Sequence, residues 1–220
     1  MNIDNKIIKH YLKNVMFING TAYAGKSTMA KMLADEFGLI CCGENYECVP
    51  DGIITPKTHP NMSYFQTMKD WQEFVNRTPQ EYYDWIVGTT QEYIEFEITY
   101  LMSISQTQKV VVDTNIPAAV LREIADYNQV AIMLSPPQMS VEHFFDRPDA
   151  DKVFIKEQVT KADDPEKTMA NYLACLAKCN SQEIYDTWAN SGFFTVLREN
   201  TTYDTKRETM EVLAKHFGLI

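Results

Sequence analysis

Eight residues near the start of this chain restrict its fold more than any other feature: positions 20–27 read Gly-Thr-Ala-Tyr-Ala-Gly-Lys-Ser. A short apolar run at 15–18 ends just before them. After them, apolar side chains recur at the spacing of one helical face, at positions 29, 32, 33 and 37, and Gly38 is placed to end that helix. The sequence therefore predicts a buried strand, a tight turn and a helix in direct succession.

The turn between this strand and this helix has the composition of a phosphate-binding loop. Gly20 and Gly25 let backbone N–H groups approach phosphate oxygens, and the helix N-terminus directs its dipole at them. Lys26, expected to face solvent until phosphate arrives, reaches the outer phosphates, and the Ser27 hydroxyl is a ligand for Mg²⁺. The predicted ATP-binding residues are Gly20, Thr21, Ala22, Tyr23, Ala24, Gly25, Lys26, Ser27 and Thr28. A glycine-rich turn that binds no nucleotide is the alternative interpretation.

Strands alternate with helices along the rest of the chain. Four further apolar runs predict strands, at 39–42, 109–113, 130–134 and 193–197. Helices are predicted at 64–76, from Pro79 to about Ser105, at 118–127, from Pro165 through Leu176, and from Thr205 to about Phe217. This alternation is typical of an α/β fold with a five-stranded parallel sheet and helices on both faces. No linker or repeat interrupts the pattern, so we expect a single domain over residues 1–220.

Ligands of such sheets bind beyond the carboxyl ends of the strands. The residues that follow predicted strand ends, and that we expect to converge, are Gly20, Glu44, Asp113, Pro136 and Arg198. In proteins with a phosphate-binding loop, an acid at the position of Asp113 faces the metal ion. Ser27 and Asp113 are therefore the predicted Mg²⁺ ligands. Alternatively, Asp113 caps the helix that follows it.

Composition and charge exclude several classes of partner. The chain has 20 Lys and Arg against 30 Asp and Glu, a formal net charge of −10, which disfavours general binding to nucleic acid. It has no apolar run long enough to span a membrane and no secretory signal pattern, so we expect a cytoplasmic protein without membrane contact. The five cysteines are expected to be reduced thiols, and two of them four residues apart, Cys175 and Cys179, are a weak alternative metal site.

The phosphate-binding turn, the strand that ends in Asp113, the chain length and the helix-rich segment between these motifs resemble the small P-loop kinases. This group includes nucleoside-monophosphate, shikimate and gluconate kinases and antibiotic phosphotransferases. The resemblance is specific over residues 15–39, good at 109–117 and architectural elsewhere. It implies the P-loop NTPase fold with strand order 2-3-1-4-5, ATP as phosphoryl donor and Mg²⁺. It also implies an acceptor-binding helical region at about 45–105 and a lid at about 138–160.

The same resemblance assigns roles to residues outside the turn. Arg147, with Lys152 second, would stabilise charge on the transferred phosphoryl group, or Arg147 forms a salt bridge with a neighbouring aspartate. Glu44 would hold or deprotonate the acceptor hydroxyl, with Asp51 as runner-up, unless it is a solvated loop acid. Arg198 would stack on adenine, or has a plain surface role.

The sequence also departs from part of this group. Nucleoside-monophosphate kinases follow the third strand with Asp-Gly-x-Pro-Arg, whereas this chain has Asp-Thr-Asn-Ile-Pro at 113–117 and lacks the paired arginines of their lid. An acceptor that is itself a nucleotide is therefore disfavoured. The aromatic residues of 45–105 suit an aromatic or sugar-like acceptor, although a packed helical core also explains them.

These observations favour an ATP-dependent phosphotransferase that acts on a hydroxyl group of a small molecule. The alternative is a nucleotide-dependent binding or regulatory protein that transfers no phosphate, and a kinase that has lost turnover is a third interpretation. A regulatory GTPase is disfavoured because the chain has no Asn-Lys-x-Asp motif. The sequence specifies neither the acceptor molecule nor an oligomeric state.

Overall fold

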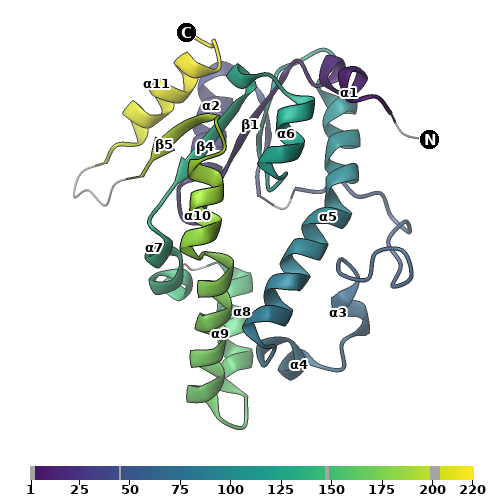
Figure 1. Ribbon diagram of the computed structural model, residues 1–220, viewed down its shortest axis with the longest axis vertical. Helices are drawn as coiled ribbons and strands as arrows, with labels where there is room; N and C mark the ends of the chain where they lie inside the picture. The colour runs from purple at the N-terminus through teal and green to yellow at the C-terminus, as the bar shows by residue number, and fades with distance from the viewer. Residues whose placement is uncertain (1–2, 45, 147–148, 199–203) are drawn as a thin grey trace. The chain divides into compact units, whose positions relative to one another are not determined.

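The computed structural model describes residues 3–44, 46–146, 149–198 and 204–220. The chain forms two compact units, each built from separate stretches of sequence (Figure 1). The sheet unit consists of Met1–Val49, Ile94–Ser135 and Tyr185–Ile220. The helical unit consists of Pro50–Tyr93 and Pro136–Ile184. The predicted phosphate-binding turn lies in the sheet unit.

Five parallel strands form the sheet: β1 (Val15–Gly20), β2 (Ile40–Cys42), β3 (Val110–Asp113), β4 (Val130–Leu134) and β5 (Phe194–Leu197). Their order is β2-β3-β1-β4-β5. This confirms the predicted α/β class, the five parallel strands and the order 2-3-1-4-5, and it is compatible with the P-loop NTPase fold. In this register Ile18 of β1 pairs with Asp113 of β3, so the end of β3 lies beside the start of the turn.

Side chains alternate between the two faces of the sheet, and each face is covered by helices. Met16 and Ile18 pack with α2 (Lys26–Phe37) and α11 (Lys206–His216) on one face. Val15 and Phe17 face the opposite cluster, which contains residues of α1 (Asn5–Tyr11), α6 (Ala118–Ile124) and α10 (Gln182–Ala189) and the end of α5 (Pro79–Ile104). Figure 1 shows α2 beside α11 and α1 close to α6, which are also contacting pairs. The two-residue period of a strand explains both layers.

The helical unit contains α3 (Tyr64–Thr67), α4 (Trp71–Val75), the first part of α5, α7 (Pro137–Glu142), α8 (Ala150–Thr160) and α9 (Pro165–Cys179). Its core is aromatic, with ring centroids 5.2 Å apart for Phe74 and Trp85 and 5.7 Å apart for Tyr82 and Tyr172. Several of the aromatic residues of 45–105, for which an aromatic or sugar-like acceptor was one explanation, therefore pack in the core of this unit. Two short 3₁₀ helices, Tyr127–Gln129 and Phe144–Asp146, complete the regular elements of the described chain.

Several helix boundaries differ from the sequence prediction. The helix predicted at 64–76 is two helices, because Met68 is extended and the Asp70 side chain starts α4 by accepting a hydrogen bond from the Glu73 N–H (3.1 Å). The capping box at the start of α5 is confirmed, since the Thr78 N–H donates to Glu81 at 2.8 Å. Thr205 precedes α11 without a side-chain capping bond, and α1, α7, α8 and α10 were not predicted. None of the five cysteines forms a disulfide, and Cys41 is the exposed one among them.

Candidate phosphate- and metal-binding site

The turn after β1 begins with a close approach between two backbones. Gly20 has a φ of +125°, and a Cβ atom there would lie 2.0 Å from the carbonyl oxygen of Met133 on β4. The backbone N–H of the next residue, Thr21, donates to the same carbonyl oxygen at 3.0 Å. Gly20 is therefore required by the neighbouring strand as well as by the shape of the turn.

The turn ends at the N-terminus of α2. Gly25 is the N-cap residue, with a φ of 88°, and its lack of a side chain leaves the first turn without a side-chain capping bond. The first turn of α2 also contains no acidic residue. Because the first N–H groups of a helix have no partner within it, this end of α2 favours an anion. Ser27 and Thr28 lie in this first turn and are exposed.

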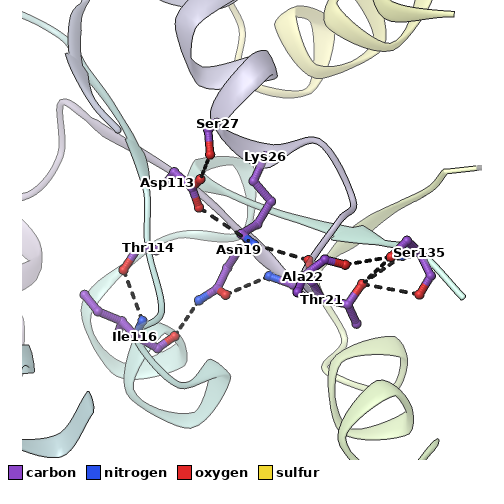
Figure 2. A network of polar contacts seen from close by, with 10 residues as sticks. Asn19, Thr21, Ala22, Lys26, Ser27, Asp113, Thr114, Ile116 and Ser135 are labelled. Carbon is purple, nitrogen blue, oxygen red and sulfur yellow. Dashed lines mark hydrogen bonds and ion pairs between the residues drawn. The ribbon is translucent and has the colours of Figure 1, made fainter. Parts of the chain in front are cut away.

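Three side chains that sequence analysis selected meet at this helix end (Figure 2). The Ser27 hydroxyl donates to Asp113 Oδ2 at 2.5 Å, and the Lys26 ammonium nitrogen lies 3.9 Å from Asp113 Oδ1. The Lys26 ammonium also donates to the carbonyl oxygen of Thr21 at 3.2 Å. The Lys26 side chain is only 11 % exposed. Lys26 was expected to face solvent and instead folds into the turn, where the Asp113 charge and the Thr21 carbonyl hold it.

Asp113 is almost completely buried and does not cap a helix. Burial raises the pKa of its carboxyl group, while Lys26 and the Ser27 hydrogen bond lower it and the negative charge of Glu44 raises it further. The helix after Asp113 begins at Ala118, and its N-cap is Pro117 without a side-chain bond. The capping interpretation of Asp113 is therefore wrong. A buried carboxylate bonded to a hydroxyl offers the oxygen ligands that Mg²⁺ prefers.

A network of polar side chains fixes the strand ends around these groups, and sequence analysis missed most of it. Asn19 accepts from the Gly20 N–H and donates to the Ile116 carbonyl, both at 2.7 Å. The Ser135 N–H donates to Thr21 Oγ1 at 2.8 Å, and the Ser135 hydroxyl donates to the Ala22 carbonyl at 2.7 Å (Figure 2). These residues hold the turn against β4 and against the segment after β3.

Tyr23 and Arg198 meet at the rim of the turn. Tyr23 has a φ of 67°, a left-handed conformation that is strained for a tyrosine. The Arg198 guanidinium donates to the Tyr23 carbonyl, and its central carbon lies 5.4 Å from the centre of the Tyr23 ring. Arg198 thus contacts Tyr23, one of the predicted nucleotide-binding residues. The side chain of Ala24, another of them, is buried in the core.

Glu44 and a second, unpredicted acid lie on the β2–β3 side of the site. Glu44 is exposed, in a turn closed by the Tyr46 N–H, which lies 3.4 Å from the Gly43 carbonyl oxygen. Glu97 of α5 is only 2 % exposed, and burial raises its pKa to about 7. Its spacing could have indicated a buried acid, since Glu97 lies four residues from both Tyr93 and Leu101, on the same side of the helix as these apolar residues.

The other predicted residues lie in the helical unit or outside the described residues. Arg147 lies outside them. Lys152 forms an ion pair with Asp149, and its nitrogen is 5.6 Å from the centre of the Phe144 ring. Asp51 is exposed and belongs to the helical unit, as does Pro136 at the N-terminus of α7.

Comparison of this chain with models of protein families, with curated proteins and with solved structures found no match.

In the part of the chain that the structure describes, no three His, Cys, Asp or Glu side chains are grouped as metal ligands. None of the described helices is long and apolar enough to cross a membrane.

Proposed function

We propose that this chain is an ATP-dependent phosphotransferase that moves the γ-phosphoryl group to a hydroxyl group of a small molecule. The observation that carries the proposal is the meeting of Lys26, Ser27 and Asp113 at the uncapped N-terminus of α2. The parallel sheet of order 2-3-1-4-5 and the resemblance to small P-loop kinases support it. We further propose that the protein works in the cytoplasm and binds neither nucleic acid nor membrane.

On the donor side, the backbone N–H groups at the start of α2 bind the phosphates, because the first turn of this helix has no side-chain capping bond. The Lys26 ammonium exchanges the Thr21 carbonyl for phosphate oxygens. Ser27 and Asp113 would hold Mg²⁺, because a hydroxyl and a carboxylate are oxygen ligands of the kind that this ion prefers. The ion supplies positive charge to the phosphoryl oxygens during transfer.

On the acceptor side, Glu44 is an exposed carboxylate whose charge acts on Asp113. We assign it to the acceptor hydroxyl, whose proton it accepts as the oxygen attacks the γ-phosphorus. A new oxygen–phosphorus bond forms while the bond from that phosphorus to the β–γ bridging oxygen breaks. ADP leaves with the electron pair of the broken bond. Arg147 and Arg198 are assigned to the transferred phosphoryl group and to the adenine base.

The proposal is tested by measuring ADP release from Mg-ATP with a panel of sugars, nucleosides, cofactors and antibiotics. The control is the variant Lys26→Met, which keeps the aliphatic stem of the side chain and removes its charge. We expect one class of acceptor to increase ADP release by the parent protein and not by the variant. Nucleotide-dependent capture of a protein partner without acceptor-dependent release would contradict the proposal and support a regulatory role.

A further inference from the structure

The turn that carries Glu44 is fixed at both ends. Before it, Cys42 is buried and paired with Val112 in the sheet. After it, the Tyr46 ring packs against α5, with its centroid 5.5 Å from that of Tyr100. The Tyr46 hydroxyl lies 3.4 Å from Glu97 Oε1, to which it donates. Glu44 itself is exposed, so its direction depends on these anchors.

Glu97 connects this anchor to the metal side of the site. The side chain of Thr114, the residue that follows Asp113, lies near the Glu97 carboxyl group and lowers its pKa. Thr114 is itself held in place, because its N–H donates to the Ile18 carbonyl at 3.0 Å and its hydroxyl accepts from the Ile116 N–H at 3.0 Å. The buried Glu97 carboxyl group therefore lies beside both Tyr46, two positions after Glu44, and Thr114, the residue next to Asp113.

We infer that Glu97 is a positioning residue that holds the Glu44 turn at a fixed place beside Asp113, an inference that rests on the proposed function of Glu44. Glu97 is too deeply buried to touch an acceptor in this structure. It acts through Tyr46: the phenol hydroxyl fixes the turn, and the turn directs the Glu44 carboxylate. A buried acid with a purely structural role would stabilise the fold without affecting how Glu44 acts.

Two substitutions separate these roles. Tyr46→Phe removes only the hydroxyl, and Glu97→Leu removes the acceptor while keeping a side chain of similar size. We expect each to lower the turnover number by about tenfold, the value of one hydrogen bond, with unchanged affinity for ATP. Glu97→Gln keeps an oxygen that accepts from Tyr46 and should retain most of the turnover. Tyr127→Phe, at a tyrosine that is 56 % exposed, is the matched control and should behave as the parent.

The decisive test repeats Tyr46→Phe in a Glu44→Gln background. If Tyr46 acts by directing Glu44, its hydroxyl has no further effect once Glu44 cannot accept a proton, so the double variant should match Glu44→Gln. An equal loss in both backgrounds, or no loss in the parent background, would overturn the inference.

A readout without catalysis separates this inference from the proposed function. Amide hydrogen exchange in residues 43–49 should be faster in Tyr46→Phe and Glu97→Leu than in the parent, with residues 20–27 unchanged. Unchanged exchange in 43–49 in both variants overturns the positioning role. Faster exchange in both variants, together with a parent protein that shows no acceptor-dependent turnover, would instead contradict the proposed function while supporting the contact.

Discussion

Burial raises the pKa of Asp113, and two neighbours lower it. The Lys26 ammonium nitrogen lies 3.9 Å from one carboxylate oxygen of Asp113, and the Ser27 hydroxyl donates to the other at 2.5 Å. A divalent cation at this position would also lower the pKa of Asp113, and by more than Lys26 does, because it carries twice the charge. Asp113→Asn keeps the shape of the side chain and removes the charge. We expect the Mg²⁺ concentration for half-maximal turnover to rise by roughly tenfold or more.

The control for this variant is Asp35→Asn, which removes an exposed acid from α2. Turnover measured against Mg²⁺ concentration distinguishes the two. A Mg²⁺ dependence identical to that of the parent, with only a lower melting temperature, would assign Asp113 to the fold alone.

Glu44 is tested by the pH dependence of the rate. If its carboxylate accepts the acceptor proton, Glu44→Gln should lower acceptor-dependent turnover by roughly 10²–10⁴-fold and leave ATP affinity nearly unchanged. The acidic limb of the parent pH–rate profile should disappear or move in the variant. Glu47→Gln, at an exposed acid three residues further along the loop, is the control. A near-parent rate with an intact acidic limb would exclude Glu44 and leave Asp51 as the next candidate.

Glu97 makes the stability of the fold depend on pH. Its pKa is raised from 4.5 to about 7, chiefly by burial, so the folded chain binds a proton that the unfolded chain has already released. Its stabilising effect is complete below pH 4.5 and is lost as the pH rises through about 7, a change on the order of 3 kcal/mol. Glu97→Gln cannot ionise and should lack this change.

Urea unfolding at pH 5 and pH 8 measures this effect. Between these values the parent should lose more free energy of unfolding than Glu97→Gln does. Equal losses in both proteins would show that the Glu97 carboxyl titrates as in the unfolded chain.

At the scale of elements, the β1–turn–α2 segment depends on two glycines for different reasons. A Cβ atom at Gly20 would meet the Met133 carbonyl at 2.0 Å, whereas one at Gly25 would meet nothing within 4 Å. We expect Gly20→Ala to lower the free energy of unfolding by at least about 3 kcal/mol, from steric overlap and backbone strain together. Gly25→Ala, strained only in its φ of +88°, should cost about 1–2 kcal/mol. Equal costs in urea unfolding would contradict the close approach to β4.

The elements that the sequence predicted correctly are those with strong local signals. β1 and α2 follow from an apolar run, a glycine-bounded turn and a periodic helical face, and α5 follows from the capping box at Thr78. The helices α1, α7, α8 and α10 were missed. Three of them, α1, α7 and α10, have only six to eight residues and contain too few periods to separate a helix from a loop, and α8 lies in a segment of mixed and charged composition. The break between α3 and α4 depends on the Asp70 cap, which a continuous apolar pattern conceals.

The site divides in a similar way. Lys26, Ser27 and Asp113 were predictable because each follows from a strand end or a motif position. Glu97 and Ser135 were not, because their roles depend on contacts with residues 51 positions (Tyr46) and 114 positions (Thr21) away in sequence. The inward fold of Lys26 was also missed, since the Asp113 charge that attracts it comes from another strand.

At the scale of the whole molecule, the chain crosses between its two units twice in loops, after Val49 and after Ser135, and twice within helices, in α5 and in α10. The sheet unit contains the residues predicted to bind ATP and the predicted Mg²⁺ ligands Ser27 and Asp113, and the sheet order agrees with the resemblance that predicted it. The segments predicted to bind the acceptor and to form the lid lie mostly in the helical unit. The central claim for the molecule is therefore that the sheet unit binds the phosphates of ATP through Lys26.

Calorimetric titration of the full chain with ATP in the presence of Mg²⁺ tests this claim most directly. We expect one ATP to bind per chain, and Lys26→Met to weaken binding by about 10–100-fold, because charged hydrogen bonds to phosphate are lost. Lys31→Met, at an exposed lysine of the same helix, should bind as the parent does. Equal ATP affinity in the parent and in a folded Lys26→Met protein would contradict the phosphate-binding role of the turn.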